Sequence, residues 1–263
     1  MNSENTDLPE LAPGTRLSLP QAFLLLCLKE KEGTLLADTL RAQHGLAGAI
    51  LAELALTGAV TIEEGEGPEP HRERRFRLRR TQSGHDVHAV YVHVQEKFAH
   101  DDGDGTFGGL LTNVCANALA KIRRSRHLQT ATDWVSDLAP AGLRHLIAEP
   151  LVQAGILDRR KRRLWGIIPL TSYPEVRPEV EERLREHIGQ RIAGAHQGTA
   201  AAVLLGLLQA TGLTRKVLGT DVDQEQVSEI VCSAALPTAV QEAVQAAYFA
   251  TVSSVAATGT DLS

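Results

Sequence analysis

Apolar residues recur at helical spacing along most of the chain and predict a mainly helical protein. A first helix is expected after Ser18, which begins the pattern of a capping box. Residues 36–42 predict a second helical piece, and Gly45 is expected to open a third helix. Gly58 follows that helix, where a left-handed residue suits a C-terminus. The alternating residues 59–62 then predict a strand.

A basic segment is expected to complete a hairpin with this strand. Residues 74–80 alternate between basic and apolar side chains, and residues 89–94 predict a further strand. The order of helix, glycine and strand returns over residues 142–157, where Gly155 occupies the position of Gly58. Basic residues follow there as well. The sequence therefore contains two similar supersecondary units.

The last third of the chain predicts a packed helical region. Residues 179–193 are amphipathic, residues 199–210 are apolar almost all round, and residues 239–257 repeat apolar positions at three-to-four spacing. We expect one mainly α domain over residues 16–258, with small β-hairpins in winged-helix-like units and one projecting hairpin. Residues 1–15 are expected to form a disordered N-terminal tail and residues 259–263 a C-terminal tail.

Composition narrows the class of protein. The chain has 263 residues, of which 43% are hydrophobic and only 4% aromatic, so its core must consist mainly of Leu, Val, Ile and Ala. Its three cysteines, Cys27, Cys115 and Cys232, are far apart in the sequence, which disfavours a disulfide framework or a zinc cluster. The longest apolar runs are too short for a membrane span. A cytoplasmic protein is expected.

Charge is unevenly distributed along the chain. The net charge is −5, yet residues 72–80 contain six arginines and one glutamate, and residues 159–163 are all basic. Two concentrated basic segments in an acidic protein suit an anionic surface partner. Taken singly, each run is equally well explained as a solvated turn.

Motifs that would indicate catalysis or a metal site are incomplete. Residues 103–108 match G-x-G-x-x-G, but no strand leads into them and no acidic residue follows at the distance a dinucleotide site needs. His85, His88, His93 and His100 are close in sequence but lie in its least regular stretch. We therefore expect no catalytic residue, no cofactor and no metal.

A nucleic-acid-binding winged helix is the first alternative. Residues 45–57 would then be the recognition helix and residues 72–80 the wing. Between residues 45 and 58, however, there is no Lys, Arg, Asn or Gln to read base edges, so nucleic acid is not the expected partner. A purely structural interaction protein is the second alternative.

Several segments resemble the Golgi phosphoprotein 3 family. The most specific is Glu53-Leu54-Ala55-Leu56, followed by Gly58 and a strand. The others are residues 17–26, 29–33 and 45–58, then Trp134, residues 151–157 and Pro169-Leu170. The resemblance implies a mostly helical peripheral protein with a projecting hairpin used in self-association. Eukaryotic members bind phosphatidylinositol 4-phosphate on Golgi membranes and hold the cytosolic tails of glycosyltransferases.

The family's lipid site is only partly kept when the sequences are aligned. Its tryptophan falls on Asp38, one arginine falls on Ala47, and an arginine pair falls on Ala141 and Arg144. Arg144 therefore carries over as a lipid-phosphate ligand. Arg41, one helical turn from Asp38, is expected to offset the Asp38 carboxylate in part and to be a second lipid-phosphate ligand.

The second basic run is expected to contact the membrane or a second copy of the chain. The segment consists of Arg159, Arg160, Lys161, Arg162 and Arg163. It predicts the turn of the projecting hairpin, with Trp165, Ile167 and Ile168 on the second strand. The chain is thus expected to be a peripheral adaptor that binds an anionic phospholipid membrane, a protein partner or a second copy. Richness in Ala, Gly, Arg and Leu suggests a bacterial source, and hence a bacterial anionic lipid.

Overall fold

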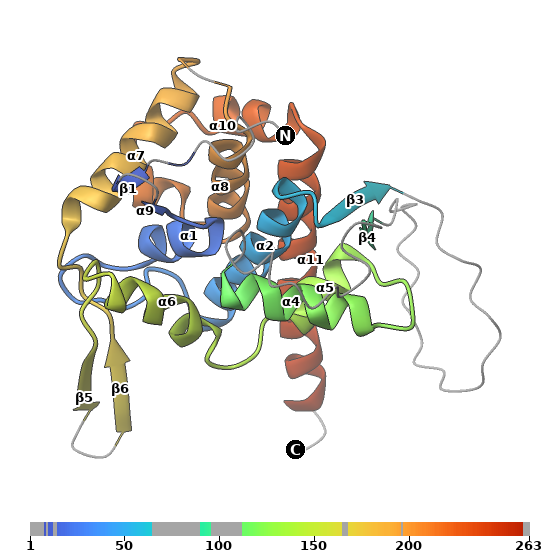
Figure 1. The fold of residues 1–263 in the computed structure, drawn as a ribbon, viewed down its shortest axis with the longest axis horizontal. Helices are drawn as coiled ribbons and strands as arrows, with labels where there is room; N and C mark the ends of the chain where they lie inside the picture. The colour runs from blue at the N-terminus through green and yellow to red at the C-terminus, as the bar shows by residue number, and fades with distance from the viewer. Residues whose placement is uncertain are drawn as a thin grey trace.

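The computed structural model describes residues 8, 10–12, 15–64, 90–95, 112–164, 168–195 and 197–259, and these are mainly helical, as predicted (Figure 1). The helices are α1 (Leu19–Cys27), α2 (Thr39–Leu56), α4 (Asn113–Arg124), α5 (Ala131–Asp137), α6 (Leu143–Gln153), α7 (Pro178–Ile192), α8 (Thr199–Ala210), α9 (Thr214–Leu218), α10 (Gln224–Cys232) and α11 (Ala235–Gly259). The strands are β1 (Glu10–Ala12), β2 (Thr15–Arg16), β3 (Val60–Glu64), β4 (Val90–Val94), β5 (Arg160–Leu164) and β6 (Ile168–Ser172), which pair in succession as antiparallel hairpins.

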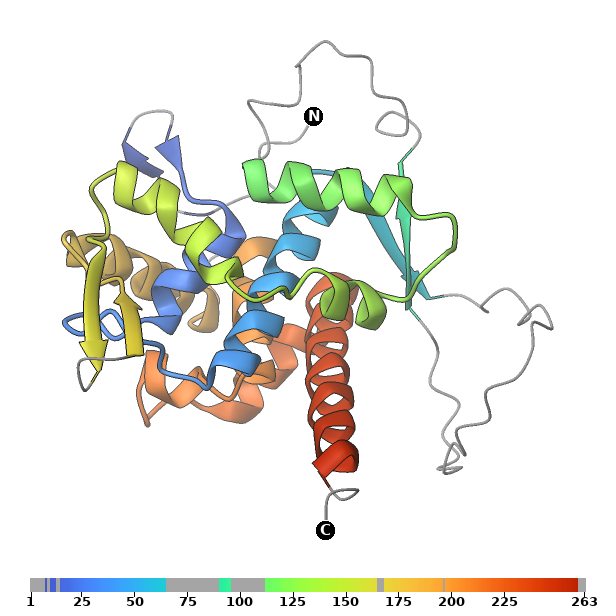
Figure 2. The same ribbon diagram turned by 90° about the horizontal axis from the view of Figure 1, so that it is seen from below.

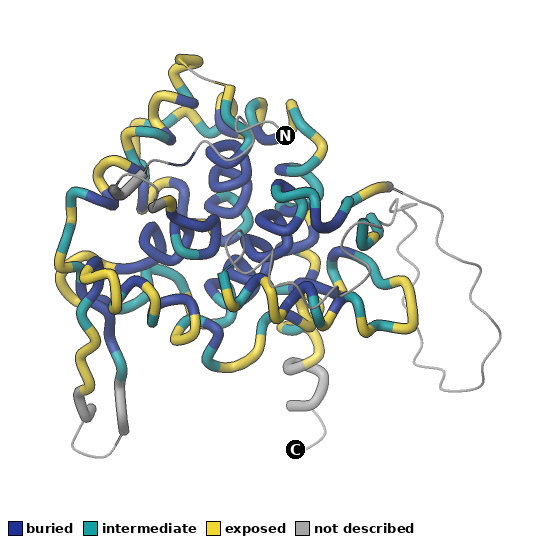
Figure 3. The backbone as a smooth tube through the Cα atoms, in the orientation of Figure 1, coloured by how far each residue is buried: buried dark blue, intermediate teal, exposed yellow. Residues whose placement is uncertain are grey.

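The core is built around α2 and α8, which are buried along most of their length (Figure 3). Helix α1 packs on α2, and α11 packs on both α2 and α8. Leu46, Ile50 and Leu54 of α2 are at most 1% exposed. A helix buried in this way cannot enter a DNA groove, which removes the recognition helix that the winged-helix alternative requires.

The prediction of two separate helical pieces before Gly58 was wrong. One helix, α2, starts after Asp38, whose Oδ1 accepts a hydrogen bond from the Arg41 backbone N–H at 2.8 Å. The helix continues through Gly45 without interruption. A Cβ at Gly45 would lie 2.5 Å from the Phe23 ring of α1. Gly45 therefore permits close helix packing and does not mark a helix start.

The two helix–glycine–strand units are confirmed. Gly58 and Gly155 have φ values of 70° and 68° at the ends of α2 and α6. Ala59 N–H donates to Leu54 O at 2.8 Å, and Ile156 N–H donates to Leu151 O at 2.9 Å. Both units therefore end in the same Schellman arrangement.

The first predicted strand pairs with the other strand predicted in this part of the chain. Strand β3 pairs with β4, with Val60 opposite Val94 and Glu64 opposite Val90. The strand predicted at residues 89–94 is thus confirmed, and the pairing expected for residues 74–80 lies outside the described residues. Alternation along one segment predicts a strand but does not select its partner.

The basic run after α6 forms a strand and not a turn. Residues 160–164 make up β5, and the register pairs Arg160 with Ser172 and Leu164 with Ile168. Ile168 lies in β6, as expected, and Trp165 and Ile167 lie outside the described residues. In Figure 1 the hairpin extends from the lower side of the helical body, as a projecting hairpin should.

A glycine in the α1–α2 connection fixes the root of this hairpin. Gly33 has φ 63°, and its carbonyl accepts a hydrogen bond from Tyr173 N–H at 2.8 Å. A Cβ at Gly33 would lie 2.0 Å from the backbone nitrogen of Pro174. Only glycine fits this close approach of two chain segments.

The C-terminal helix is packed over only part of its length. Val240, Val244 and Ala247 are buried, whereas Phe249 is 62% exposed and Val252 is 40% exposed. The expectation of a packed helix over residues 239–257 therefore holds for its first turns. Among the described helices, α11 included, none is both long enough and apolar enough to cross a bilayer.

Candidate functional site

Arg144 lies at the N-terminal turn of α6, beside the hairpin root. Gly142 precedes the helix with φ 93°, which turns the chain into α6. The Nη2 of Arg144 donates to the carbonyl oxygen of Thr171 at 3.0 Å, and its guanidinium lies 5.7 Å from the centroid of the Tyr173 ring. Burial lowers the pKa of Arg144, although an arginine stays charged at physiological pH. The side chain is thus held between α6 and β6 and keeps its charge.

His145 and Tyr173 complete the hairpin root. The Nδ1 of His145 is hydrogen-bonded to the Tyr173 hydroxyl at 2.7 Å, and the two rings are 5.6 Å apart. Burial, followed by the nearby charges of Arg144 and Arg159, lowers the pKa of His145. A neutral imidazole at neutral pH leaves the two arginines as the cations of this region.

A small cavity lies between the start of α2 and the start of α6. Its volume is about 80 Å³, and its lining residues are Leu35, Thr39, Ala42, Gln43, Leu46, Gly142, Arg144 and His145. This volume is enough for a few water molecules or one phosphate group. It is too small to enclose a complete sugar-phosphate head group.

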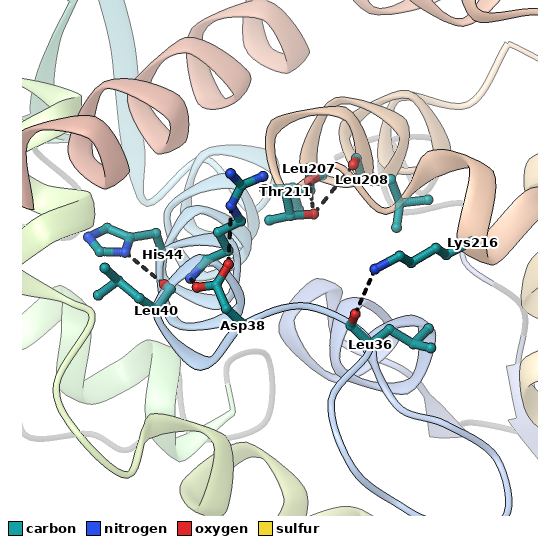
Figure 4. Close-up of polar contacts among 9 residues, drawn as sticks. Leu36, Asp38, Leu40, His44, Leu207, Leu208, Thr211 and Lys216 are labelled. Carbon is teal, nitrogen blue, oxygen red and sulfur yellow. Dashed lines mark hydrogen bonds and ion pairs between the residues drawn. The ribbon is translucent and has the colours of Figure 1, made fainter. Parts of the chain in front are cut away.

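Arg41 faces away from this cavity. Its Nε pairs with Asp38 Oδ2 at 3.1 Å, and its guanidinium lies 4.6 Å from the centroid of the Tyr248 ring on α11. Hydrogen bonding with the Tyr248 side chain raises the pKa of Arg41. Figure 4 shows Asp38 at the start of α2, with Lys216 of α9 beyond Leu36 and donating to the Leu36 carbonyl at 3.1 Å. The structure therefore does not bring Arg41 and Arg144 together in one cavity.

The other aligned family positions carry no cation in this chain. Asp38 caps α2, Ala47 is fully buried in the core, and Ala141 lies in the turn before α6. The buried position of Ala47 leaves no room for a long side chain. Arg144 is the aligned cation that remains.

The exposed residues of the second basic run lie on and beside β5. Arg159 pairs with Glu149 through its Nη1 at 3.0 Å, and Arg160 pairs with Asp158 through its Nε at 3.0 Å. Lys161 is exposed. Exposed ion pairs of this kind contribute about 0–1 kcal/mol, so they exchange readily for another anion. Arg162 and Arg163 belong to β5, while Trp165 lies outside the described residues.

A larger groove runs between α1, α4 and α6. Its volume is about 620 Å³, and apolar side chains such as Ile50, Leu143 and Ile147 form much of its wall. Lys121 also lines it, but the Nζ of this lysine donates to the Asp137 carbonyl. His145 lines both the groove and the small cavity. The groove is therefore suited to apolar contact and not to a phosphate.

Two contacts at the hairpin root were missed by the sequence analysis. Tyr173 is 1% exposed, and its pairing with His145 and Arg144 joins segments nearly thirty positions apart. Tyr173 could have been singled out from the sequence, because aromatic residues are rare in this chain. Glu175, two residues later, packs beside the buried Glu181 of α7, and burial raises the pKa of Glu175 to about 9.

The histidine group considered for a metal site is not assembled by the described part of the chain. His93 is exposed on β4, and His85, His88 and His100 lie outside the described residues. Within the described residues, no group of three or more His, Cys, Asp or Glu side chains is arranged to hold a metal ion.

Comparison with known proteins identifies the family. No curated protein matches the chain. The family model described as Golgi phosphoprotein 3 (GPP34) matches residues 19–247, which include α1, both Schellman glycines, the projecting hairpin and the first half of α11. This match spans far more than half of the sequence, and the chain therefore belongs to the Golgi phosphoprotein 3 (GPP34) family.

Proposed function

We propose that this protein is a peripheral membrane adaptor that binds anionic lipid head groups from the cytoplasmic side. The head group would be phosphatidylinositol 4-phosphate or another anionic phospholipid, as membership of the family suggests. The observation that carries the proposal is the projecting β5 strand, on which Arg160 and Lys161 are exposed although the chain as a whole is acidic.

Arg144 is the proposed head-group ligand. It lines the small cavity next to the α6 N-terminus, where backbone N–H groups and the helix dipole favour an anion. The hydrogen bond to Thr171 uses one of the five guanidinium donors, and the same bond fixes the side chain's direction. A phosphate at the mouth of the cavity would then contact the Arg144 guanidinium, which the bond to Thr171 already holds in position.

Arg41 is a weaker candidate for the same role. Its contacts with Asp38 and Tyr248 would have to be shared with a lipid phosphate. We propose that Arg41 supports binding through its charge, together with Arg159, Arg160 and the rest of the β5 run. Each basic residue near an anionic bilayer contributes about 1 kcal/mol. A binding role of this kind requires no catalytic group.

Vesicle flotation tests this proposal. Wild type and single alanine variants are compared on vesicles of phosphatidylcholine alone, with phosphatidylglycerol, and with phosphatidylinositol 4-phosphate. Arg144→Ala should weaken binding to the phosphoinositide about tenfold, since one charged hydrogen bond contributes about 1.5–3 kcal/mol. Arg160→Ala should weaken binding slightly and equally on both anionic surfaces.

Arg126→Ala provides the matched control, because Arg126 is exposed in the α4–α5 connection, away from the hairpin. It should bind like the wild type. If Arg144→Ala and Arg160→Ala behave alike on every composition, the head-group site is refuted and only a charged surface is left. Absence of wild-type binding to anionic vesicles at low salt would refute the adaptor proposal as a whole.

A further inference from the structure

The end of α11 presents an apolar pair that the fold does not cover. Phe249 is 62% exposed and Val252 is 40% exposed, and their spacing of three places them on one side of the helix. The inner side of α11, with Val244 and Ala247, packs on the core. The exposed pair therefore lies on the outer side of α11, while Thr251 on the inner side still forms a hydrogen bond with His44 of α2 at 3.3 Å.

The same part of the helix carries no charge. From Ala243 to Thr260 the sequence has no Asp, Glu, Lys or Arg. The exposed side of a helix in water is ordinarily charged or strongly polar. Phenylalanine and valine flanked by alanine, serine and threonine instead fit the boundary between water and lipid.

A cation–aromatic cluster lies directly beside the exposed pair. Arg41 lies over the Tyr248 ring, and the Tyr248 and Phe249 rings are 5.7 Å apart in an edge-to-face arrangement. Tyrosine and arginine are residues that settle at head-group level, with the polar end in water and the apolar part toward lipid. This cluster would sit at the membrane surface with Phe249 and Val252 below it.

The direction of α11 agrees with that of the basic hairpin. Figure 1 shows β5–β6 and the C-terminal end of α11 extending from the same side of the molecule, and Figure 2, seen from that side, shows them on opposite flanks of α2. Arg160 and Lys161 on the hairpin would meet anionic head groups. A surface that attracts these cations would bring the apolar helix end to the bilayer at the same time.

We infer that the C-terminal end of α11, through Phe249 and Val252, inserts into the interfacial region of an anionic lipid bilayer as a second anchor beside the β5–β6 hairpin. The inference rests on the proposed membrane role, and it adds an apolar contact to the electrostatic one. Partial burial of a phenylalanine side chain in lipid does not depend on ionic strength, whereas attraction of the hairpin to head groups weakens as salt rises.

Vesicle flotation at about 0.1 M and 1 M salt separates the two contacts. Vesicles contain phosphatidylcholine and phosphatidylglycerol at seven to three. Phe249→Ser should reduce the fraction bound at high salt at least tenfold, because it removes the apolar contact, and Phe249→Leu should restore most of it. Leu128→Ser is the matched control, since Leu128 is 42% exposed in the α4–α5 connection. It should bind like the wild type.

A fluorophore gives a second, independent readout of insertion. In a Cys232→Ser background the remaining cysteines, Cys27 and Cys115, are buried. Val252→Cys, labelled with an environment-sensitive dye, should shift its emission to the blue when vesicles are added. Leu128→Cys labelled in the same way should not shift.

The outcomes separate this inference from the proposed function. If the wild type binds at low salt but Phe249→Ser matches Leu128→Ser and the dye at residue 252 does not shift, the α11 anchor is refuted and the head-group proposal stands. If Phe249→Ser instead converts a wild-type dimer to a monomer without changing vesicle binding, the helix end contacts a second copy and the anchor is equally refuted. No wild-type binding at either salt concentration would refute both proposals.

Discussion

Glu53 of α2 accepts a hydrogen bond from the backbone N–H of Leu19, the first residue of α1, at 2.8 Å. Both residues are buried, with Glu53 6% exposed and Leu19 fully buried. Burial raises the pKa of Glu53, and the bond from Leu19 lowers it by less. The acidic residue in the Glu53-Leu54-Ala55-Leu56 signature thus has a structural role, since it satisfies an orphan donor at the N-terminus of the neighbouring helix.

We expect Glu53→Ala to lower the free energy of unfolding by about 1–3 kcal/mol, because it leaves the buried Leu19 N–H without a partner. Glu53→Gln should lower the free energy of unfolding by less, since the amide oxygen can still accept the hydrogen bond from the Leu19 N–H. Urea unfolding followed by circular dichroism measures both. Glu229→Ala, at an exposed position on α10, is the control and should change stability little. Equal losses for the alanine and glutamine variants would contradict this role of Glu53.

Gly33→Ala should be more damaging than Gly155→Ala, although both glycines have positive φ values of 63° and 68°. A Cβ at Gly155 meets nothing within 4 Å, so that variant carries only left-handed strain of about 1–2 kcal/mol. At Gly33 the Cβ would collide with the backbone of Tyr173 and Pro174. The free energy of unfolding should therefore fall by several kcal/mol in Gly33→Ala. Urea midpoints that agree for the two variants would contradict the close approach at the hairpin root.

Stability should fall as the pH rises from about 5 to 9, in part because of Glu175. Burial, then the hydrogen bond and the charge of Glu181, raise the pKa of Glu175 from 4.5 to about 9, with Glu30 adding to the rise and Arg185 opposing it. The unfolded chain ionises Glu175 near pH 4.5, whereas the folded chain keeps the proton. The stabilising contribution is therefore complete below pH 4.5 and is lost as the pH passes through about 9.

Glu175→Gln tests this pH dependence, since the amide is neutral at every pH and still donates to Glu181. Its unfolding free energy should depend less on pH than that of the wild type when urea unfolding is measured at pH 5, 7 and 9. Glu182→Gln, at an exposed position on the same helix as Glu181, should follow the wild type. A Glu175→Gln curve parallel to the wild type would show that Glu175 does not hold the proton.

One of the three cysteines should react rapidly with a thiol reagent in the folded protein. Cys232 is exposed, whereas Cys27 and Cys115 are buried, and burial raises the pKa of both buried thiols. The thiolate is the reactive form, so both access and ionisation protect the buried pair. Titration with a disulfide reagent should give one equivalent before denaturation and three after it. A Cys232→Ser variant that still reacts rapidly would disagree with this burial.

Local sequence signals predicted the features that depend on short-range interactions. Residues 199–210 were predicted as a helix apolar all round, and α8 has these bounds and lies in the core. Gly58 and Gly155 were recognised from the residues just before and after them, because a left-handed cap is decided by the lack of a Cβ. Hydrophobic periodicity and helix capping depend on residues that are close together in the sequence, so both can be predicted without knowledge of the fold.

Signals that depend on distant segments were misread. Gly45 was taken for a helix start because glycine is a poor helix former, whereas the reason for it is the ring of Phe23 on another helix. The basic run at residues 159–163 was taken for a turn because it lies between two apolar segments, whereas residues 160–163 pair with β6. Phe23 is far from Gly45 in the sequence, whereas β6 is close to β5, and its pairing depends on backbone hydrogen bonds that the charge of the run does not reveal.

For the candidate site, too, some features follow from the sequence and others only from the tertiary structure. The sequence by itself determined the mainly helical fold, the family resemblance and the position of Arg144 at the start of α6, because these follow from local pattern and aligned residues. Only the tertiary structure decided that Arg144 contacts Thr171 and Tyr173, that Arg41 faces Tyr248, and that Phe249 is left exposed. These contacts join residues tens to hundreds of positions apart, and burial is decided only when all the helices have packed.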